Sequence, residues 1–74
     1  MIYYADNDTL RGAILRVMRD GRPRTKSTIA RELDTTGSRI RFTLQRMVAD
    51  GELQQLTAYG HVATRYQATS KARA

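Results

Sequence analysis

The spacing of the apolar residues changes near residue 52, and this change limits the chain to a fold that combines helices with a small sheet. Between residues 7 and 50, apolar side chains recur at the spacing of amphipathic helices. After Glu52, the stretches ELQQLTA and HVATRYQAT alternate loosely and include Val, Thr and Tyr, which favour strands. We therefore predict an α+β fold in which three helices precede a two-stranded β-hairpin.

The chain divides into several segments of one predicted domain. Its 74 residues are enough for a single small core. Proline, glycine and capping residues mark the segment ends. The predicted segments are an N-terminal arm (1–6), a first helix (7–20), a second helix (26–33), a third helix (37–50), a hairpin (52–68) and a flexible basic tail (69–74).

Threonines and glycines define the expected helix ends. Thr25 precedes the second helix and Thr36 the third, where a Thr hydroxyl can accept a hydrogen bond from a free backbone N–H. Gly21 and Gly51 follow the first and third helices, a position that favours glycine. Gly12 lies inside the first helix, where Gly costs about 1 kcal/mol relative to Ala. We interpret it as the mark of a close approach to a neighbouring element.

The third predicted helix has one apolar face and one polar face. At 100° per residue, Leu44 and Met47 lie within about 40° of Ile40 and Val48 lies at about 80°, and these four residues are the predicted core face. Arg41 lies on the flank. The far side holds Ser38, Arg39, Phe42, Gln45, Arg46 and Ala49. The chain's one Phe therefore falls on the face that should meet water.

The charge of the chain is strongly positive and uneven. Lys and Arg number 13 against seven Asp and Glu, which gives a formal net charge of +6. Residues 22–50 hold seven basic and three acidic side chains, a net +4, whereas residues 1–21 are neutral. Most of the basic residues are Arg, whose planar fork suits phosphates and guanine edges. This distribution predicts a surface that faces a polyanion.

The composition argues against several functions. There is no Cys, and the single histidine, His61, has no carboxylates grouped beside it, so we expect no metal site and no cofactor. No nucleophile set or phosphate-cradling glycine loop is present, so we expect no enzyme and see no small-molecule ligand. No apolar run approaches the roughly 18 residues of a membrane span, and MIYY is no signal peptide. The expected location is the cytoplasm, in association with the nucleoid.

The stretch IARELDTTGSRIRFTLQRMVADGELQQ, residues 29–55, resembles the winged helix-turn-helix domain. It has two apolar-faced helices joined by a short polar turn, followed by Gly51 and Leu53 at the start of a hairpin. The likeness extends over residues 8–68. Over this range the chain resembles small bacterial, archaeal and phage transcription regulators of the marR, arsR and papI-like kind. It implies a sequence-specific protein that binds double-stranded DNA.

The resemblance also implies which residues contact DNA. The far side of the third helix would enter the major groove, where Arg bonds guanine and Gln bonds adenine. The predicted base-reading set is Ser38, Arg39, Phe42, Gln45 and Arg46. The connection before the second helix, which we expect to be extended, holds Arg22, Arg24 and Lys26 at alternate positions, so this row of cations points one way and suits backbone phosphates. Together with Arg41, these three are the predicted phosphate contacts. The hairpin, or wing, would contribute Tyr59, His61 and Arg65.

Phe42 has three interpretations at this stage. It can contact thymine methyl groups in the major groove, as apolar side chains do. It can contact a protein partner or a second copy of the chain. Alternatively, the third helix is rotated relative to our prediction, and Phe42 packs against the second helix or the hairpin.

The remaining alternatives concern partners. A homodimer could form through the N-terminal arm, where Ile2, Tyr3 and Tyr4 supply apolar contacts. Winged helices also serve as protein–protein adaptors and as RNA-binding modules. The first hypothesis is a small transcriptional regulator that binds DNA; the adaptor and the RNA-binding module are the alternatives.

Overall fold

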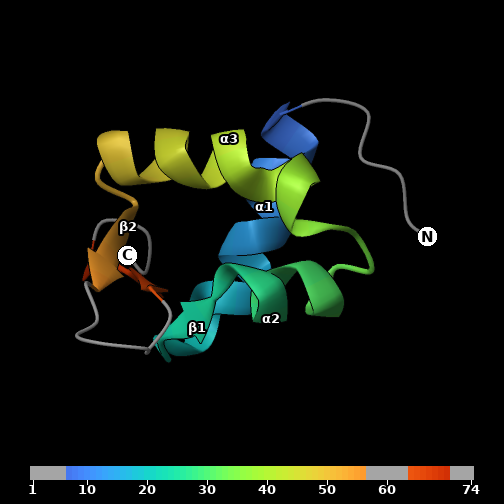
Figure 1. Cartoon of the computed structure of the whole chain (residues 1–74). Helices are drawn as coiled ribbons and strands as arrows, with labels where there is room; N and C mark the ends of the chain where they lie inside the picture. Colours follow the sequence, from blue (N-terminus) through green and yellow to red (C-terminus); the bar gives the residue numbers. More distant parts are fainter. Residues whose placement is uncertain (1–6, 57–63, 71–74) are drawn as a thin grey trace.

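Three α-helices and a small antiparallel sheet make up the computed structural model, which describes residues 7–56 and 64–70. The helices are α1 (Asn7–Val17), α2 (Lys26–Glu32) and α3 (Gly37–Ala49), with a 3-10 turn η1 (Met18–Asp20) directly after α1. The strands are β1 (Arg24–Thr25), β2 (Leu53–Leu56) and β3 (Arg65–Ala68). In Figure 1, α3 lies above α2, α1 passes between them, and the strands gather toward one end.

One apolar cluster joins the helices to the sheet. It receives side chains from α1, η1, α2, α3, β2 and β3, so no element buries its apolar face alone. Partly buried residues, among them Val48 and Tyr66, pack against its margin. The buried members are Leu10, Ile14, Met18, Ile29, Ala30, Leu33, Ile40, Leu44, Met47, Leu53 and Ala68.

The sheet has three strands in the order β1-β3-β2, so the predicted two-stranded hairpin was one strand short. The additional strand is β1, which lies in the connection that we expected only to link the first two helices. Arg24 pairs with Tyr66, and on the other side of β3 Leu53 pairs with Ala68, both in antiparallel register. Pro23 favours extended backbone in the residue before it. The Gln67 side chain donates to the Gly21 carbonyl at 2.8 Å and further joins the connection to β3.

The helix ends follow the predicted capping residues. The Thr28 backbone N–H donates to Thr25 Oγ1 at 3.2 Å, and the Arg39 N–H donates to Thr36 Oγ1 at 3.3 Å. Both caps are confirmed, and they set the starts of α2 and α3. Gly21, with φ 78°, follows η1, because the predicted first helix tightens into a 3-10 turn over its last residues.

Two details differ from the expectations. Gly12 is exposed, and a Cβ built on it would meet no described atom of a neighbouring element within 4 Å, so the predicted close approach is wrong within the described part of the chain. Thr69, predicted to lie in the flexible tail, donates its hydroxyl to the Gly51 carbonyl at 2.5 Å and its N–H to the Glu52 carbonyl at 3.0 Å. The chain after β3 is therefore joined to the turn that follows α3.

Candidate nucleic-acid interface

The two faces of α3 differ sharply in exposure. Ile40, Leu44 and Met47 have no exposed surface, as the 100° spacing predicted. The opposite side is solvent-exposed along the whole helix and forms what we call the outer face: Ser38, Arg39, Arg41, Phe42, Gln45, Arg46 and Ala49. The thirteen residues of α3 include no Asp or Glu. The outer face therefore combines positive charge and hydrogen-bonding groups without an acidic side chain of its own.

Phe42 lies on this outer face with 69% of its surface exposed. It is the one large exposed hydrophobic side chain among the residues that the structure describes. The interpretation in which a rotated α3 buries Phe42 is therefore wrong. The Arg41 guanidinium lies over the Phe42 ring, with its carbon 5.0 Å from the ring centroid, which is within cation–π range. The other two interpretations of Phe42, a contact with DNA and a contact with a protein, are both consistent with this exposure.

Two arginines away from the outer face bind most of the described carboxylates. Arg11, on α1, forms ion pairs with Asp50 at 3.1 Å and with Glu52, both of which follow α3. These contacts fix the end of α3 against α1. Because their carboxylates are already engaged by Arg11, Asp50 and Glu52 do little to offset the positive charge of the outer face.

Arg24 is the centre of the second ion-pair cluster, which corrects our view of the connection before α2. Its two terminal nitrogens each donate to one oxygen of Asp20 at 2.8 Å, and its Nε lies 3.6 Å from Glu32. The Arg24 side chain is only 16% exposed. Its side chain therefore serves the fold, and we remove it from the predicted phosphate contacts.

The electrostatics of this cluster are reciprocal. Hydrogen bonds from the Arg24 side chain, and next from the Arg22 backbone N–H, hold the pKa of Asp20 well below its usual range. The same hydrogen bond to Asp20 raises the pKa of Arg24. Both groups stay charged over the physiological pH range, so the cluster joins η1, β1 and α2 without a change of protonation.

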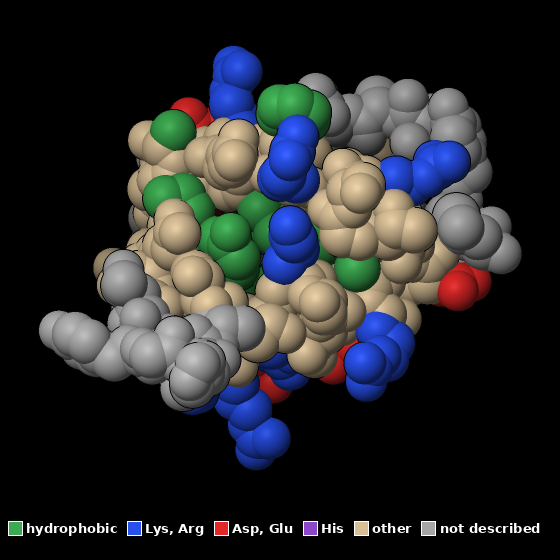
Figure 2. All heavy atoms as spheres, viewed as in Figure 1, with side chains coloured by type: hydrophobic (Ala, Val, Ile, Leu, Met, Phe, Trp, Pro, Cys, Tyr) green, Lys and Arg blue, Asp and Glu red, His purple; other side chains and the backbone are tan. Residues whose placement is uncertain are grey.

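The remaining positive charge has few acidic neighbours. Residues 9–56 and 64–70 hold eleven Lys or Arg and five Asp or Glu, a net +6. Arg11 and Arg24 engage four of these five carboxylates. In the view of Figure 2, acidic side chains are visible only near the edge, whereas Lys and Arg side chains cross the middle. The protein thus separates its charges in space, and the surplus lies outside the two clusters.

Lys26 lies beside the start of α3, a contact that was not predicted. It is the first residue of α2, yet a Cβ built on Gly37 would come within 3.2 Å of its Cε. The stem of Lys26 therefore crosses the first turn of α3, next to the exposed Ser38. Arg22, by contrast, is exposed in the connection that precedes β1. Of the predicted phosphate contacts, Arg41 is therefore part of the outer face, and Lys26 lies beside it.

The predicted wing contacts fall partly outside the described residues. Tyr59 and His61 lie outside them, as do Ile2, Tyr3 and Tyr4 of the predicted dimer contact. Arg65 begins β3 and is exposed, opposite Thr25 on β1 and Leu56 on β2.

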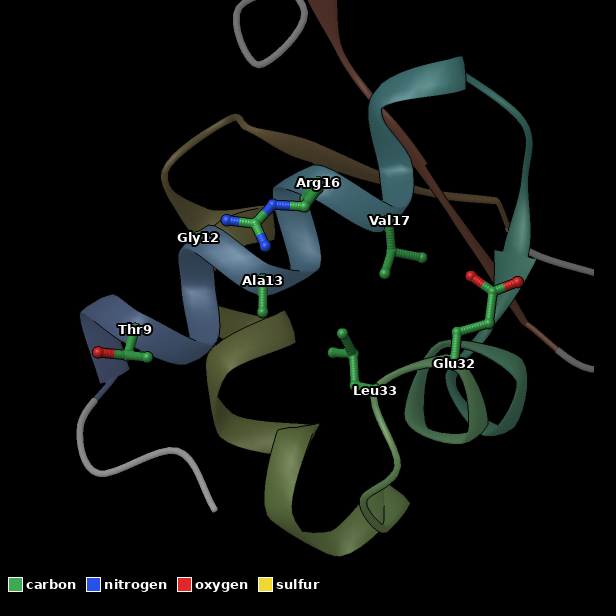
Figure 3. Close-up of a pocket in the computed structure, with 7 residues that line it drawn as sticks. All are labelled: Thr9, Gly12, Ala13, Arg16, Val17, Glu32 and Leu33. Atoms are coloured by element: carbon green, nitrogen blue, oxygen red, sulfur yellow. The ribbon is translucent and has the colours of Figure 1, made fainter. Parts of the chain in front are cut away.

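A shallow groove between α1 and the end of α2 was not predicted from the sequence. In Figure 3, Val17 and Leu33 approach each other across it, Arg16 lies along α1, and Glu32 stands on the α2 side. Its lining is mixed, with Thr9, Gly12 and Ala13 completing the α1 wall. Within the described ranges, no group of His, Asp and Glu side chains could hold a metal ion. No helix in these ranges is long and apolar enough to span a membrane.

No protein-family model, curated protein or solved structure matches the chain. The outer face must therefore be interpreted from its own chemistry.

Proposed function

We propose that the protein is a winged helix-turn-helix protein that binds double-stranded DNA and places the outer face of α3 in the major groove. In this proposal α2 and α3 form the helix-turn-helix unit, and β2 and β3 form the base of the wing. The protein would regulate transcription by binding, with no chemistry of its own. The α+β architecture, with its three helices and antiparallel sheet, is compatible with this arrangement.

The observation that carries the proposal is the absence of acidic side chains from α3 together with the engagement of carboxylates elsewhere. No ion pair joins Arg41 or Arg46 to a carboxylate among the residues that the structure describes. A surface helix that served only solubility would gain from mixed charges, because opposite charges four residues apart stabilise a helix. A helix that enters a groove lined by phosphates gains from positive charge alone.

The dimensions and residue types of α3 suit the major groove. Its thirteen residues span about 20 Å, and a groove about 12 Å wide admits an α-helix. Arg39 and Arg46 can make paired hydrogen bonds to guanine, and Gln45 can do so to adenine. Ser38, in the first turn of α3, and Lys26, whose stem lies beside that turn, can bind backbone phosphates, which position a protein without specifying sequence.

Salt-dependent binding to duplex DNA tests the proposal. Fluorescence anisotropy with a labelled duplex should give a linear fall of log K with log salt, with a slope near −5 for about six phosphate contacts. Selection from a random duplex library should then enrich a defined sequence. A palindromic product would indicate a dimer, because half-site symmetry mirrors protein symmetry. Failure to bind any duplex at low salt would overturn the proposal.

The exposure of Phe42 favours a second candidate, an adaptor that binds an acidic protein surface. A bare aromatic ring among arginines is a typical centre of a protein interface. This candidate predicts no duplex binding at low salt, so the same anisotropy titration separates the two functions.

A further inference from the structure

Phe42 and Arg41 form a feature of the outer face that a purely electrostatic DNA-binding surface does not require. The ring is 69% exposed, while the other large apolar side chains of the described residues are buried or half-buried. Exposed in this way, Phe42 gains little from burial within the chain. It also contributes no charge to the attraction of phosphates. Any functional contribution of the ring therefore comes from direct contact with a ligand.

The position of Phe42 narrows what that ligand group can be. On a helix, Phe42 is a close neighbour of Arg39, Gln45 and Arg46, which lie three or four residues away. If these side chains meet base edges, the ring meets the floor of the same groove. Bases inside a duplex are stacked, so the ring cannot stack on them. The apolar group that the major groove does offer is the 5-methyl group of thymine.

Arg41 restricts the ring that would make this contact. Its guanidinium lies over the ring at 5.0 Å, and a cation–π contact of this kind is attractive at an exposed site. A guanidinium that covers a ring face keeps its N–H groups available at its rim for a phosphate oxygen. Arg41 and Phe42 can therefore combine an apolar contact with a base and a charged contact with the DNA backbone. The contact with Arg41 also reduces the mobility of the ring before binding.

We propose that Phe42 is a specificity-determining residue that contacts pyrimidine 5-methyl groups in the major groove, with Arg41 as the residue that positions its ring. This inference rests on the proposed function. The 5-methyl group can belong to thymine or to 5-methylcytosine, since both project it from the same position into the groove. The protein then favours methyl-bearing base pairs opposite the middle of α3, between the base pairs contacted by its polar side chains.

Alternating DNA polymers with and without the methyl group test this inference. The full chain is titrated by anisotropy competition with poly(dA-dT), poly(dA-dU), poly(dG-dC) and poly(dG-5-methyl-dC). Burial of one methyl group corresponds to about 0.8 kcal/mol, or about a fourfold change in affinity. We expect poly(dA-dT) to bind about fourfold more tightly than poly(dA-dU). The 5-methylcytosine polymer should exceed poly(dG-dC) by a similar factor.

Variants separate the methyl contact from other differences between the polymers. Phe42→Ala should bind the methylated and unmethylated polymers alike, whereas Phe42→Leu should keep part of the preference. Arg41→Gln should weaken binding to all four polymers and reduce the methyl preference. Circular dichroism and thermal melting should show every variant folded like the parent chain, because Phe42 and Arg41 are both exposed.

Three results would overturn the inference. The first is duplex binding by the parent chain with no methyl preference, which leaves the proposed function intact. The second is a preference for methylated polymers in Phe42→Ala that equals that of the parent chain, because the preference would then come from differences in polymer structure and not from the ring. The third is tighter binding to single strands that Phe42→Ala abolishes, because this would show that the ring stacks on unpaired bases. Failure to bind any duplex would instead overturn the proposed function itself.

Discussion

The inner and outer faces of α3 each contain apolar side chains, but among the described residues only those of the inner face are buried in the core. On the inner face, Ile40, Leu44 and Met47 are fully buried against the rest of the core. On the outer face, Phe42 is mostly exposed and has only Arg41 over its ring. The difference shows that apolar residues at similar spacing along one helix can serve folding on one face and remain available for binding on the other.

The same comparison applies to the arginines of the two regions. Arg11 is held by Asp50 and Glu52 beside the end of α3, so it belongs to the scaffold. Arg46 lies on the outer face without a carboxylate partner among the described residues. Stability and binding should therefore depend on different residues, and substitutions on the two faces can be used to test this separation.

The largest expected effect is on stability and comes from the inner face. Leu44→Ala should lower the free energy of unfolding by about 2–5 kcal/mol, because it leaves a cavity in a fully packed core. Phe42→Ala, as the matched change on the outer face, should alter it by less than about 0.5 kcal/mol. Urea denaturation followed by circular dichroism measures both values. Equal losses would mean that Phe42 has a structural contact.

The next effect is on binding and comes from the outer face. If Arg46 bonds a guanine, Arg46→Ala should lower affinity for the selected duplex by about 5- to 150-fold, which corresponds to 1–3 kcal/mol. Its unfolding curve should not change. Arg16→Ala removes the same charge from α1, beside the groove of Figure 3, and serves as the control. If both variants lose affinity equally and for every sequence, Arg46 does not read bases.

A smaller effect on stability should come from the ion pairs that fix α3 against α1. Arg11→Met keeps much of the side-chain volume but leaves Asp50 and Glu52 without this cation, so we expect a loss of about 1 kcal/mol in unfolding free energy. DNA affinity, measured well below the melting temperature, should stay within twofold of the parent chain's, on the order of 0.4 kcal/mol. A large loss of affinity at full folding would show that Arg11 also sets the position of the outer face.

The smallest expected effect is a loss of stability in acid, and it comes from the Arg24 cluster. The folded-state pKa of Asp20 is depressed, so its contribution to stability is full above its unfolded pKa of about 4. The contribution is lost as pH falls through the lower folded-state value. Thermal melting between neutral pH and acid should show a fall in melting temperature, and Asp20→Asn should remove the part of this fall that comes from protonation of Asp20.

The helices were predictable because their signals are local. The apolar spacing of α3 identified its buried face, and single side chains, Thr25 and Thr36, marked the starts of α2 and α3. The exposure of Phe42 followed from the same spacing. Each of these inferences needed only residues within a few positions of one another.

The parts that the sequence did not predict depend on distant partners. β1 has two residues, too few for an alternating pattern, and its partner strand begins about forty positions later in the chain. Arg24 appeared to belong to a row of cations, because its contacts with Asp20 and Glu32 arise only when η1 and α2 fold around the connection. Exposed cations such as Arg22 and engaged ones such as Arg24 cannot be separated by composition.

The strand order has a consequence for the synthesis of the chain. β3 lies between β1 and β2, but it is the last of the three strands to leave the ribosome. Until Ala68 has emerged, β1 and β2 have no edge to pair with, and Leu53 lacks its partner in the sheet. The nascent chain can therefore form its helices before the sheet, because the sheet must wait for β3. A chain from which β3 has not yet emerged has unpaired strand edges that other chains can pair with.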